Sequence, residues 1–234
     1  MGDRKPDAAE ASLTLSRTRL LVIGTLLVLV AIVVGVLVGR ANAPAAAQTP
    51  EESSAEAGFA RDMQVHHGQA VEMSLIIRER TDDPEIRLLA LDIAIGQTQQ
   101  QGQMFAWLTM WGLPQTSSGP AMEWMSMPAL NSDEQGRDHT GMDMTNGSSS
   151  DALGGAMPGM ATPDDLQLLS SLIGVEAERL FLELMTEHHL GGVAMAEAVL
   201  ARTDMPFVTN LANGMVQLQS QEIDYMRELL AERQ

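Results

Sequence analysis

Cysteine is absent from this 234-residue chain, so disulfide bonds and thiolate metal sites are excluded. Basic residues are scarce: 14 lysines and arginines stand against 31 aspartates and glutamates, and the formal net charge is −17. Nucleic acid is therefore an unsuitable partner, because phosphate binding needs a basic face. Aromatic residues make up only 3% of the chain, although 45% of it is hydrophobic. The core must be built from aliphatic side chains and from the 17 methionines.

The longest uncharged run lies near the N-terminus, from Leu20 to Val38. A 19-residue helix at about 1.5 Å per residue spans about 28 Å, close to the hydrocarbon core of a bilayer. Basic residues precede this run and acidic residues follow it, which predicts a cytoplasmic N-terminus at 1–19, a transmembrane anchor at 20–38 and an exported remainder. Residues 39–53 read as a flexible tether. The alternative is cleavage in the small-residue stretch ANAPAAAQ, which would make the protein secreted.

One pattern occurs twice: MQVHHGQAVEM begins at Met63 and MTEHHLGGVAM begins at Met185. When the sequence is shifted by 122 residues (from 63 to 185), the two halves align without a gap. Over residues 59–108, 16 of 50 positions are then identical. We interpret this match as an internal duplication.

Each repeat reads as a helical hairpin, because its apolar residues recur at the 3–4 spacing of one helix face. In the first repeat, RTDDP ends the first helix, and Asp82 is expected to cap the second, with Pro84 in its first turn. Hairpin one is predicted at 54–111 and hairpin two at 163–233, with a short extra helix at 163–174. Each apolar face can be buried only against the other, so residues 54–233 are predicted to form an all-α four-helix bundle with approximate two-fold symmetry.

A linker at 112–162 joins the hairpins and is too rich in glycine, serine and proline to be regular throughout. It nevertheless carries closely spaced thioethers and one imidazole, which either contact metal or pack onto the bundle. These residues are Met122, Met125, Met127, His139, Met142, Met144, Met157 and Met160.

The histidine pairs framed by methionines predict a soft-metal site. Thioether sulfur favours Cu(I) and, by the same argument, Ag(I), and imidazole also binds copper. On a helix, Met63 shares a face with His66 or His67. Adjacent histidines diverge by about 100°, so one of each pair is expected to point into the bundle and the other to its edge. The competing interpretation is that the methionines only pack the core.

Hairpin geometry also predicts partners for the histidines. If the turn centres near Asp82, Gln97 lies level with His67, and Gln219 is its counterpart in the second repeat. A buried amide needs hydrogen-bond partners. We therefore expect Gln97 and Gln219 to orient the histidines, with Gln100 and Glu222 nearby.

Motifs of common enzyme sites are missing. No histidine has a glutamate three residues before it, as di-iron bundles require, and H-E-x-x-H, G-x-S-x-G and P-loop motifs are absent. The sequence therefore predicts a binding protein and not an enzyme. An oxidoreductase that uses bound copper is a weaker alternative, because no substrate pocket can be read from the sequence.

The chain resembles the family called domain of unknown function 305 in FARDMQVHHGQAVEM, LFLELMTEHHLGGVAM, GQTQQQGQM, VQLQSQEIDYM and AMPGM. The resemblance covers roughly residues 54–233. It implies a ferritin-like four-helix bundle, and some members of the family are exported copper-binding proteins. Carried over by position, it implies metal ligation by Met63, His66, His67, Met73, Met104, Met160, Met185, His188, His189, Met195 and Met226. One departure is that Gln100 in the first unit corresponds to Glu222 in the second, so the halves are expected to bind unequally.

These observations together predict a membrane-anchored, extracytoplasmic protein that binds Cu(I), with Ag(I) as a second soft ion. Its expected role is copper sequestration, delivery or tolerance. The alternative is a structural or protein-interaction bundle that binds no metal and presents a methionine-rich surface to a partner.

Overall fold

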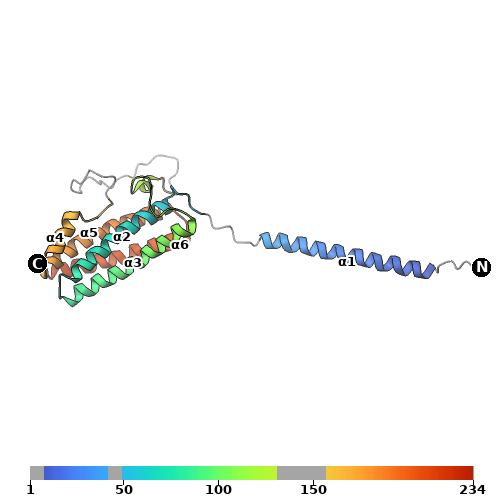
Figure 1. Ribbon diagram of the computed structural model, residues 1–234, viewed down its shortest axis with the longest axis horizontal. Helices are drawn as coiled ribbons and strands as arrows, with labels where there is room; N and C mark the ends of the chain where they lie inside the picture. Colours follow the sequence, from blue (N-terminus) through green and yellow to red (C-terminus); the bar gives the residue numbers. More distant parts are fainter. Residues whose placement is uncertain (1–7, 42–48, 131–156, 234) are drawn as a thin grey trace, which may run out of the picture. The chain divides into compact units, whose positions relative to one another are not determined.

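The computed structural model of the chain describes residues 8–41, 49–130 and 157–233, and every regular element in these ranges is a helix (Figure 1). The chain divides into two compact units, residues 1–48 and 49–234. The first unit contains helix α1 (Ala8–Ala41). Its stretch Arg19–Arg40 is long and apolar enough to cross a membrane by length and composition, and a signal sequence would have the same character.

The first hairpin consists of α2 (Ala55–Arg78) and α3 (Pro84–Trp111). The carboxylate of Asp83 starts α3 by accepting hydrogen bonds from two backbone N–H groups of the first turn, at 2.9 and 3.1 Å. The cap is therefore one residue later than Asp82, which the sequence suggested. Gly112 ends α3 at φ 69°, a left-handed conformation that suits glycine.

The second hairpin consists of α5 (Val175–Leu200) and α6 (Pro206–Ala231). The predicted extra helix precedes it as α4 (Pro163–Ser171). This short helix is started by a capping box, in which Thr162 and Asp165 exchange side-chain and backbone hydrogen bonds.

The predicted all-α fold is confirmed, and the four long helices of the second unit (α2, α3, α5 and α6) form a bundle. Helix α2 packs on α3 and on α5, and α5 packs on α6. One apolar cluster contains the first residues of α2 and α6 and the last residues of α3 and α5. A second cluster contains the last residues of α2 and α6 and the first residues of α3 and α5. Neighbouring helices therefore run in opposite directions, as the two hairpins require.

The duplication is visible in a reciprocal pair of hydrogen bonds between the hairpins. The hydroxyl of Thr81 donates to Glu178, and the hydroxyl of Thr203 donates to Glu56 at 2.6 Å. These positions correspond under the 122-residue shift, since 81 maps to 203 and 56 maps to 178. The bundle thus has the two-fold relation that the repeat predicted.

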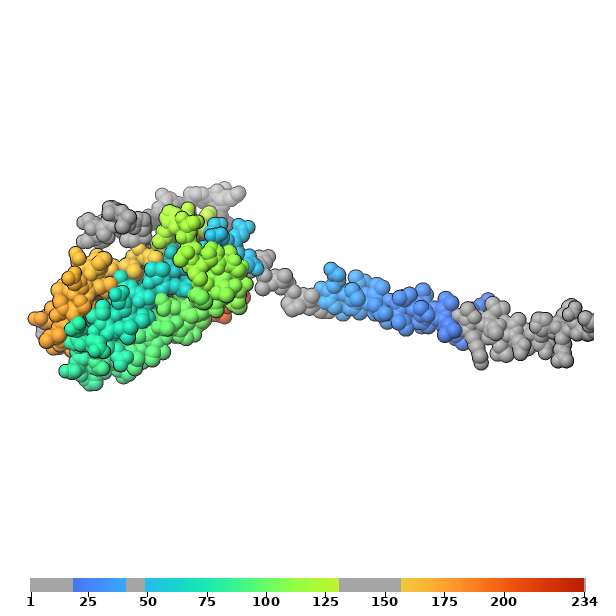
Figure 2. Space-filling view, viewed as in Figure 1, coloured from blue at the N-terminus to red at the C-terminus, as the bar shows by residue number. Residues whose placement is uncertain are grey.

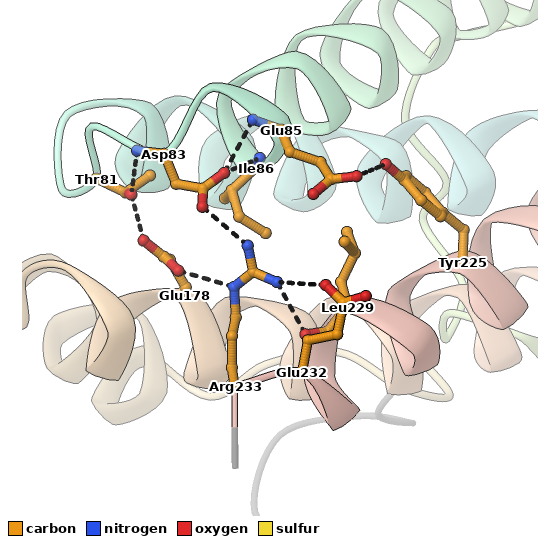
Figure 3. Close-up of polar contacts among 9 residues, drawn as sticks. All are labelled: Thr81, Asp83, Glu85, Ile86, Glu178, Tyr225, Leu229, Glu232 and Arg233. Carbon is orange, nitrogen blue, oxygen red and sulfur yellow. Dashed lines mark hydrogen bonds and ion pairs between the residues drawn. The ribbon is translucent and has the colours of Figure 1, made fainter.

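Arg233 departs from this symmetry at one end of the bundle (Figure 3). Its guanidinium donates to the carboxylates of Glu178 at 2.8 Å and Asp83 at 3.0 Å. The end of the chain is thereby joined to the start of α5 and to the turn between α2 and α3.

The segment 112–130 lies against the first residues of α2 (Figure 2). It contains a single 3₁₀ turn, η1 (Glu123–Ser126), which buries Trp124 against Phe59 with ring centroids 5.8 Å apart. The indole N–H of Trp124 donates to Asp62 at 2.9 Å. A surface cavity of about 720 Å³ lies between this segment and α2.

Candidate metal centre

Four histidines occupy the middle of the bundle, two on α2 and two on α5. His66, His67, His188 and His189 are each at most 1% exposed. The rings of His66 and His188 lie against each other across the α2–α5 contact, with centroids 3.8 Å apart and planes inclined by 32°. The sequence predicted that one histidine of each pair would point to the bundle edge; both members of each pair are buried, and His66 contacts the covering segment at Pro158.

Two of the histidines donate to side chains of their own hairpin. His67 Nε2 lies 2.6 Å from Gln100 Oε1, and His189 Nε2 lies 2.9 Å from Glu222 Oε2. Both contacts join residues 33 positions apart and correspond under the repeat. Because each oxygen accepts, the proton of each imidazole is on Nε2.

The other two histidines donate to backbone carbonyls. His66 Nε2 lies 3.1 Å from the carbonyl oxygen of Pro158, and His188 Nε2 lies 3.0 Å from that of His66. All four imidazoles therefore carry their proton on Nε2 and a lone pair on Nδ1. The four Nδ1 atoms are buried without a hydrogen-bond partner. Such unmatched acceptors are rare in protein interiors and call for an explanation.

Burial keeps three of these imidazoles, those of His66, His67 and His188, neutral. It lowers the pKa of His66 to about 4 and that of His67 to about 3, and it holds the pKa of His188 well below its usual range. Neutral imidazole is the form that binds metal, because the lone pair of the ligating nitrogen must be free. At neutral pH the side chains of His66, His67 and His188 need lose no proton before they bind an ion.

The six framing methionines are fully buried above and below the histidines. Met63, Met104 and Met195 belong to one apolar cluster, and Met73, Met185 and Met226 belong to the other. Each cluster therefore combines two thioethers of one hairpin with one thioether of the other. The sequence did not single out Met215, which is also buried in the first cluster.

The predicted roles of Gln97 and Gln219 are not what the structure shows. Both side-chain polar atoms of Gln97 and the Oε1 atom of Gln219 are buried without a partner, and the histidines instead contact Gln100 and Glu222. Helical side chains lean toward the N-terminus of their own helix. His67 therefore reaches toward the later residues of the antiparallel α3, beyond the residue level with its Cα.

The segment MPGM (residues 157–160) covers His66 and His188 on the outside. Gly191 on α5 leaves room for it, because a Cβ there would lie 2.0 Å from the Pro158 oxygen. Gly159, at φ 74°, would likewise bring a Cβ to 2.2 Å from the Glu187 oxygen. Gln69 exchanges two hydrogen bonds with Ala161, at 2.7 and 2.8 Å, and fixes the segment to α2.

The linker methionines take several positions. Met160 and Met157 are half-buried in the MPGM segment. Met122 and Met125 are half-buried on the first apolar cluster, whereas Met127 is exposed. His139, Met142 and Met144 lie outside the described residues.

Within the described parts of the chain, no three histidine, aspartate or glutamate side chains come together in a group that could hold a metal ion. An ion in this core would therefore depend on thioether sulfur as well as on imidazole nitrogen. This requirement favours a soft ion over a hard one.

The fold and the site define an internally duplicated four-helix bundle with imidazoles and thioethers at its centre. The DUF305 family, described as a domain of unknown function, matches residues 56–230, and the chain belongs to this family. No curated protein matches the chain.

Three solved structures illustrate the likeness. A DUF305 protein of Streptomyces coelicolor, described as a candidate secreted protein, is 46% identical over 78% of this chain and 96% of its own, with a TM-score of 0.65. A DUF305 fragment from Deinococcus radiodurans is 32% identical over 76% and 96%, with a TM-score of 0.56. CopM in its Cu(I)-bound form is 22% identical over 76% and 96%, with a TM-score of 0.51, which indicates a shared fold.

Proposed function

We propose that the bundle binds a soft monovalent metal ion, Cu(I) or Ag(I), between its buried imidazoles and thioethers. The observation that carries the proposal is the set of four buried Nδ1 atoms without partners. A buried polar atom left unpaired costs about 1–3 kcal/mol, so four in one core are a substantial penalty. A bound ion would offset this penalty by using the lone pairs as ligands.

The ligand chemistry selects the ion. His67 and Met63 are one helical turn apart, as are His189 and Met185, so nitrogen and sulfur are available in each hairpin. Neutral nitrogen and sulfur ligands suit Cu(I) and Ag(I), which need little charge compensation. CopM, which shares the fold, has been solved in Cu(I)-bound, Cu(II)-bound and Ag-bound forms, so the fold is compatible with such ions.

The cellular role follows from the N-terminal segment. Helix α1 would anchor the protein with its N-terminus in the cytoplasm and the bundle outside, or would act as a signal that is cleaved. A binding protein in this location would sequester or deliver copper and carry out no catalysis. The alternative is a metal-free interaction module that presents a methionine-rich surface to a partner; Met110 and Met127 are exposed, whereas the six framing methionines are buried.

The test is competition between the full-length protein in detergent and a Cu(I) chelator under anaerobic conditions. The key variant changes the six framing methionines to leucine, which nearly conserves volume and removes sulfur. We expect its Cu(I) affinity to fall at least tenfold. The matched control, Met110→Leu with Met205→Leu, alters methionines outside the centre and should bind like the wild type. Equal binding by all three proteins, or none by the wild type, would refute the proposal.

A further inference from the structure

The two halves of the centre differ in one histidine contact. Half one is defined by Met63, His67, Gln100 and Met104, and half two by Met185, His189, Glu222 and Met226. In half one the imidazole donates to an amide oxygen, and in half two it donates to a carboxylate. The two contacts have similar lengths, 2.6 and 2.9 Å, and occupy equivalent positions in the repeat.

The other members of the two halves are matched. All four methionines and both histidines are fully buried, and both histidines have an unpartnered Nδ1. Glutamine and glutamate also have nearly the same shape. The remaining difference between the defined members of the halves is therefore one negative charge, carried by Glu222 with 16% of its side chain exposed.

A carboxylate that accepts from a metal-binding imidazole increases the basicity of that imidazole and adds negative charge near the ion. Charge compensation matters more for a divalent ion than for a monovalent one, because the surroundings are apolar and screen charge weakly. Divalent copper also accepts imidazole readily. A neutral amide in the same position gives no such compensation.

We propose, building on the proposed function, that half two accepts Cu(II) as well as Cu(I), whereas half one is restricted to soft monovalent ions. One chain would then hold copper in either oxidation state. Residue 100 would determine which oxidation state half one accepts, and residue 222 would determine it for half two. The proposal concerns equilibrium preference and involves no electron transfer within the protein.

The surroundings of the two residues allow the charge to be exchanged. Gln100 and Glu222 both border a small gap of about 10 Å³ between α3 and α6, which Gln97 and Gln219 also line. About one water molecule fits such a space. A glutamate introduced at position 100 would border the amides of Gln97 and Gln219, and the carboxylates of Asp92 and Glu222 line the same gap, so the double exchange is the variant that keeps the number of charges constant.

The experiment compares the wild type, Glu222→Gln, Gln100→Glu and the double exchange, each as the full-length protein in detergent. Cu(II) affinity is measured without reductant by equilibrium dialysis, and imidazole ligation is followed by electron paramagnetic resonance. We expect Glu222→Gln to weaken the imidazole-bound Cu(II) site 10- to 100-fold. Gln100→Glu should create a second such site, and the double exchange should restore a single one.

Cu(I) competition on the same proteins distinguishes failure of soft-metal binding from failure of the difference between the halves. Wild type that binds neither Cu(I) nor Ag(I) refutes the proposed function. If the wild type binds Cu(I) but the exchanges at positions 100 and 222 leave the Cu(II) affinity unchanged, only the proposed difference between the halves is refuted. That second result is also expected if Cu(II) is held by His139 or by surface carboxylates. If Glu222→Gln fails to fold, as judged by circular dichroism, the gain in Gln100→Glu still decides the matter.

Discussion

The buried histidines should make the metal-free protein sensitive to mild acid. The unfolded chain takes up protons near pH 6.5, whereas folded His66 and His67 have pKa values of about 4 and about 3. Below pH 6.5 the unfolded state therefore binds more protons, and the free energy of unfolding falls as the pH falls. Each such histidine contributes up to about 1.4 kcal/mol per pH unit, down to its folded pKa.

The measurement is chemical denaturation of the metal-free protein at several pH values between 7 and 4. His67→Leu removes one titrating group and should reduce the slope by about one proton. An unfolding free energy that stays constant over this range would show that the histidines are charged or accessible in the folded state.

The unpaired amide of Gln97 predicts a stabilising substitution. Both of its polar side-chain atoms are buried without partners, so Gln97→Leu removes a desolvation cost and should raise the free energy of unfolding by roughly 1–2 kcal/mol. The control is Gln100→Leu, which should destabilise the protein because it removes the acceptor of His67. Denaturant titration of both variants measures the difference. A loss of stability in Gln97→Leu would indicate that ordered water satisfies the amide.

The contacts of the histidines could not be predicted from the sequence, because they depend on atoms of other segments. Spacing on a helix gave the correct burial for His66 and His67 as a set, but it could not show that MPGM covers the outward member. Gln97 is level with His67 by Cα position, but the lean of helical side chains brings His67 to Gln100 instead. The spacing of residues along one helix does not predict which atoms of a neighbouring segment they contact.

Elements were predicted more reliably than contacts. Periodic apolar positions, the turn at residues 80–84 and the repeat itself were sufficient to place all four long helices. The sequence pointed to the MPGM segment through its methionines and through the family resemblance of AMPGM, and neither predicted its packing. Its packing depends on two glycines 32 residues apart, at 159 and 191, and this relation leaves no periodic signal in the sequence.

Gly191→Ala should detach the MPGM segment. Alanine normally stabilises a helix relative to glycine by about 1 kcal/mol, but here its methyl group would overlap the Pro158 oxygen. We expect a net destabilisation of roughly 1–3 kcal/mol. Faster hydrogen exchange at residues 157–162 should accompany it. The control is Gly102→Ala in exposed helix, where no atom lies within 4 Å and stability should rise slightly. Similar gains in both variants would contradict the close contact.

The contacts of Arg233 predict that the end of the chain stabilises the bundle (Figure 3). Its side chain is 9% exposed and joins Glu178, itself 5% exposed, to Asp83. Arg233→Ala leaves these carboxylates without their cation and should cost roughly 2 kcal/mol. Arg227→Ala is the control: its pair with Asp224 is 3.8 Å long and exposed, so it should cost less than about 0.5 kcal/mol. Equal losses in the two variants would contradict a special role for Arg233.

At the scale of the whole molecule, the duplication supplies two similar halves, and differences between the repeats make these halves unequal. The reciprocal Thr81–Glu178 and Thr203–Glu56 contacts preserve the two-fold relation. Arg233 and the MPGM segment break this relation at the ends and side of the bundle, and Glu222 breaks it at the centre. A site built on a near-symmetric scaffold can thus differ in charge while its geometry is maintained.

The orientation of the full chain is the remaining prediction. Four basic residues lie before the apolar run (Arg4, Lys5, Arg17 and Arg19), and only Arg40 follows it closely. This bias should keep the N-terminus in the cytoplasm and place the bundle outside. A reporter enzyme that is active only outside the cytoplasm, fused after residue 234, should therefore be active.

Reversing the charge bias provides the control for this topology. Changing Arg17 and Arg19 to glutamate while adding lysines after Arg40 should reduce reporter activity, because the orientation follows the distribution of basic residues. Separating membrane from soluble fractions and measuring the mass of the product distinguishes a retained anchor from a cleaved signal. If a reporter that is active only in the cytoplasm were active when fused at the same place, the predicted orientation would be wrong. The centre would then have to obtain copper from the cytoplasm, where thiols compete strongly for Cu(I) because thiolate is also a soft ligand.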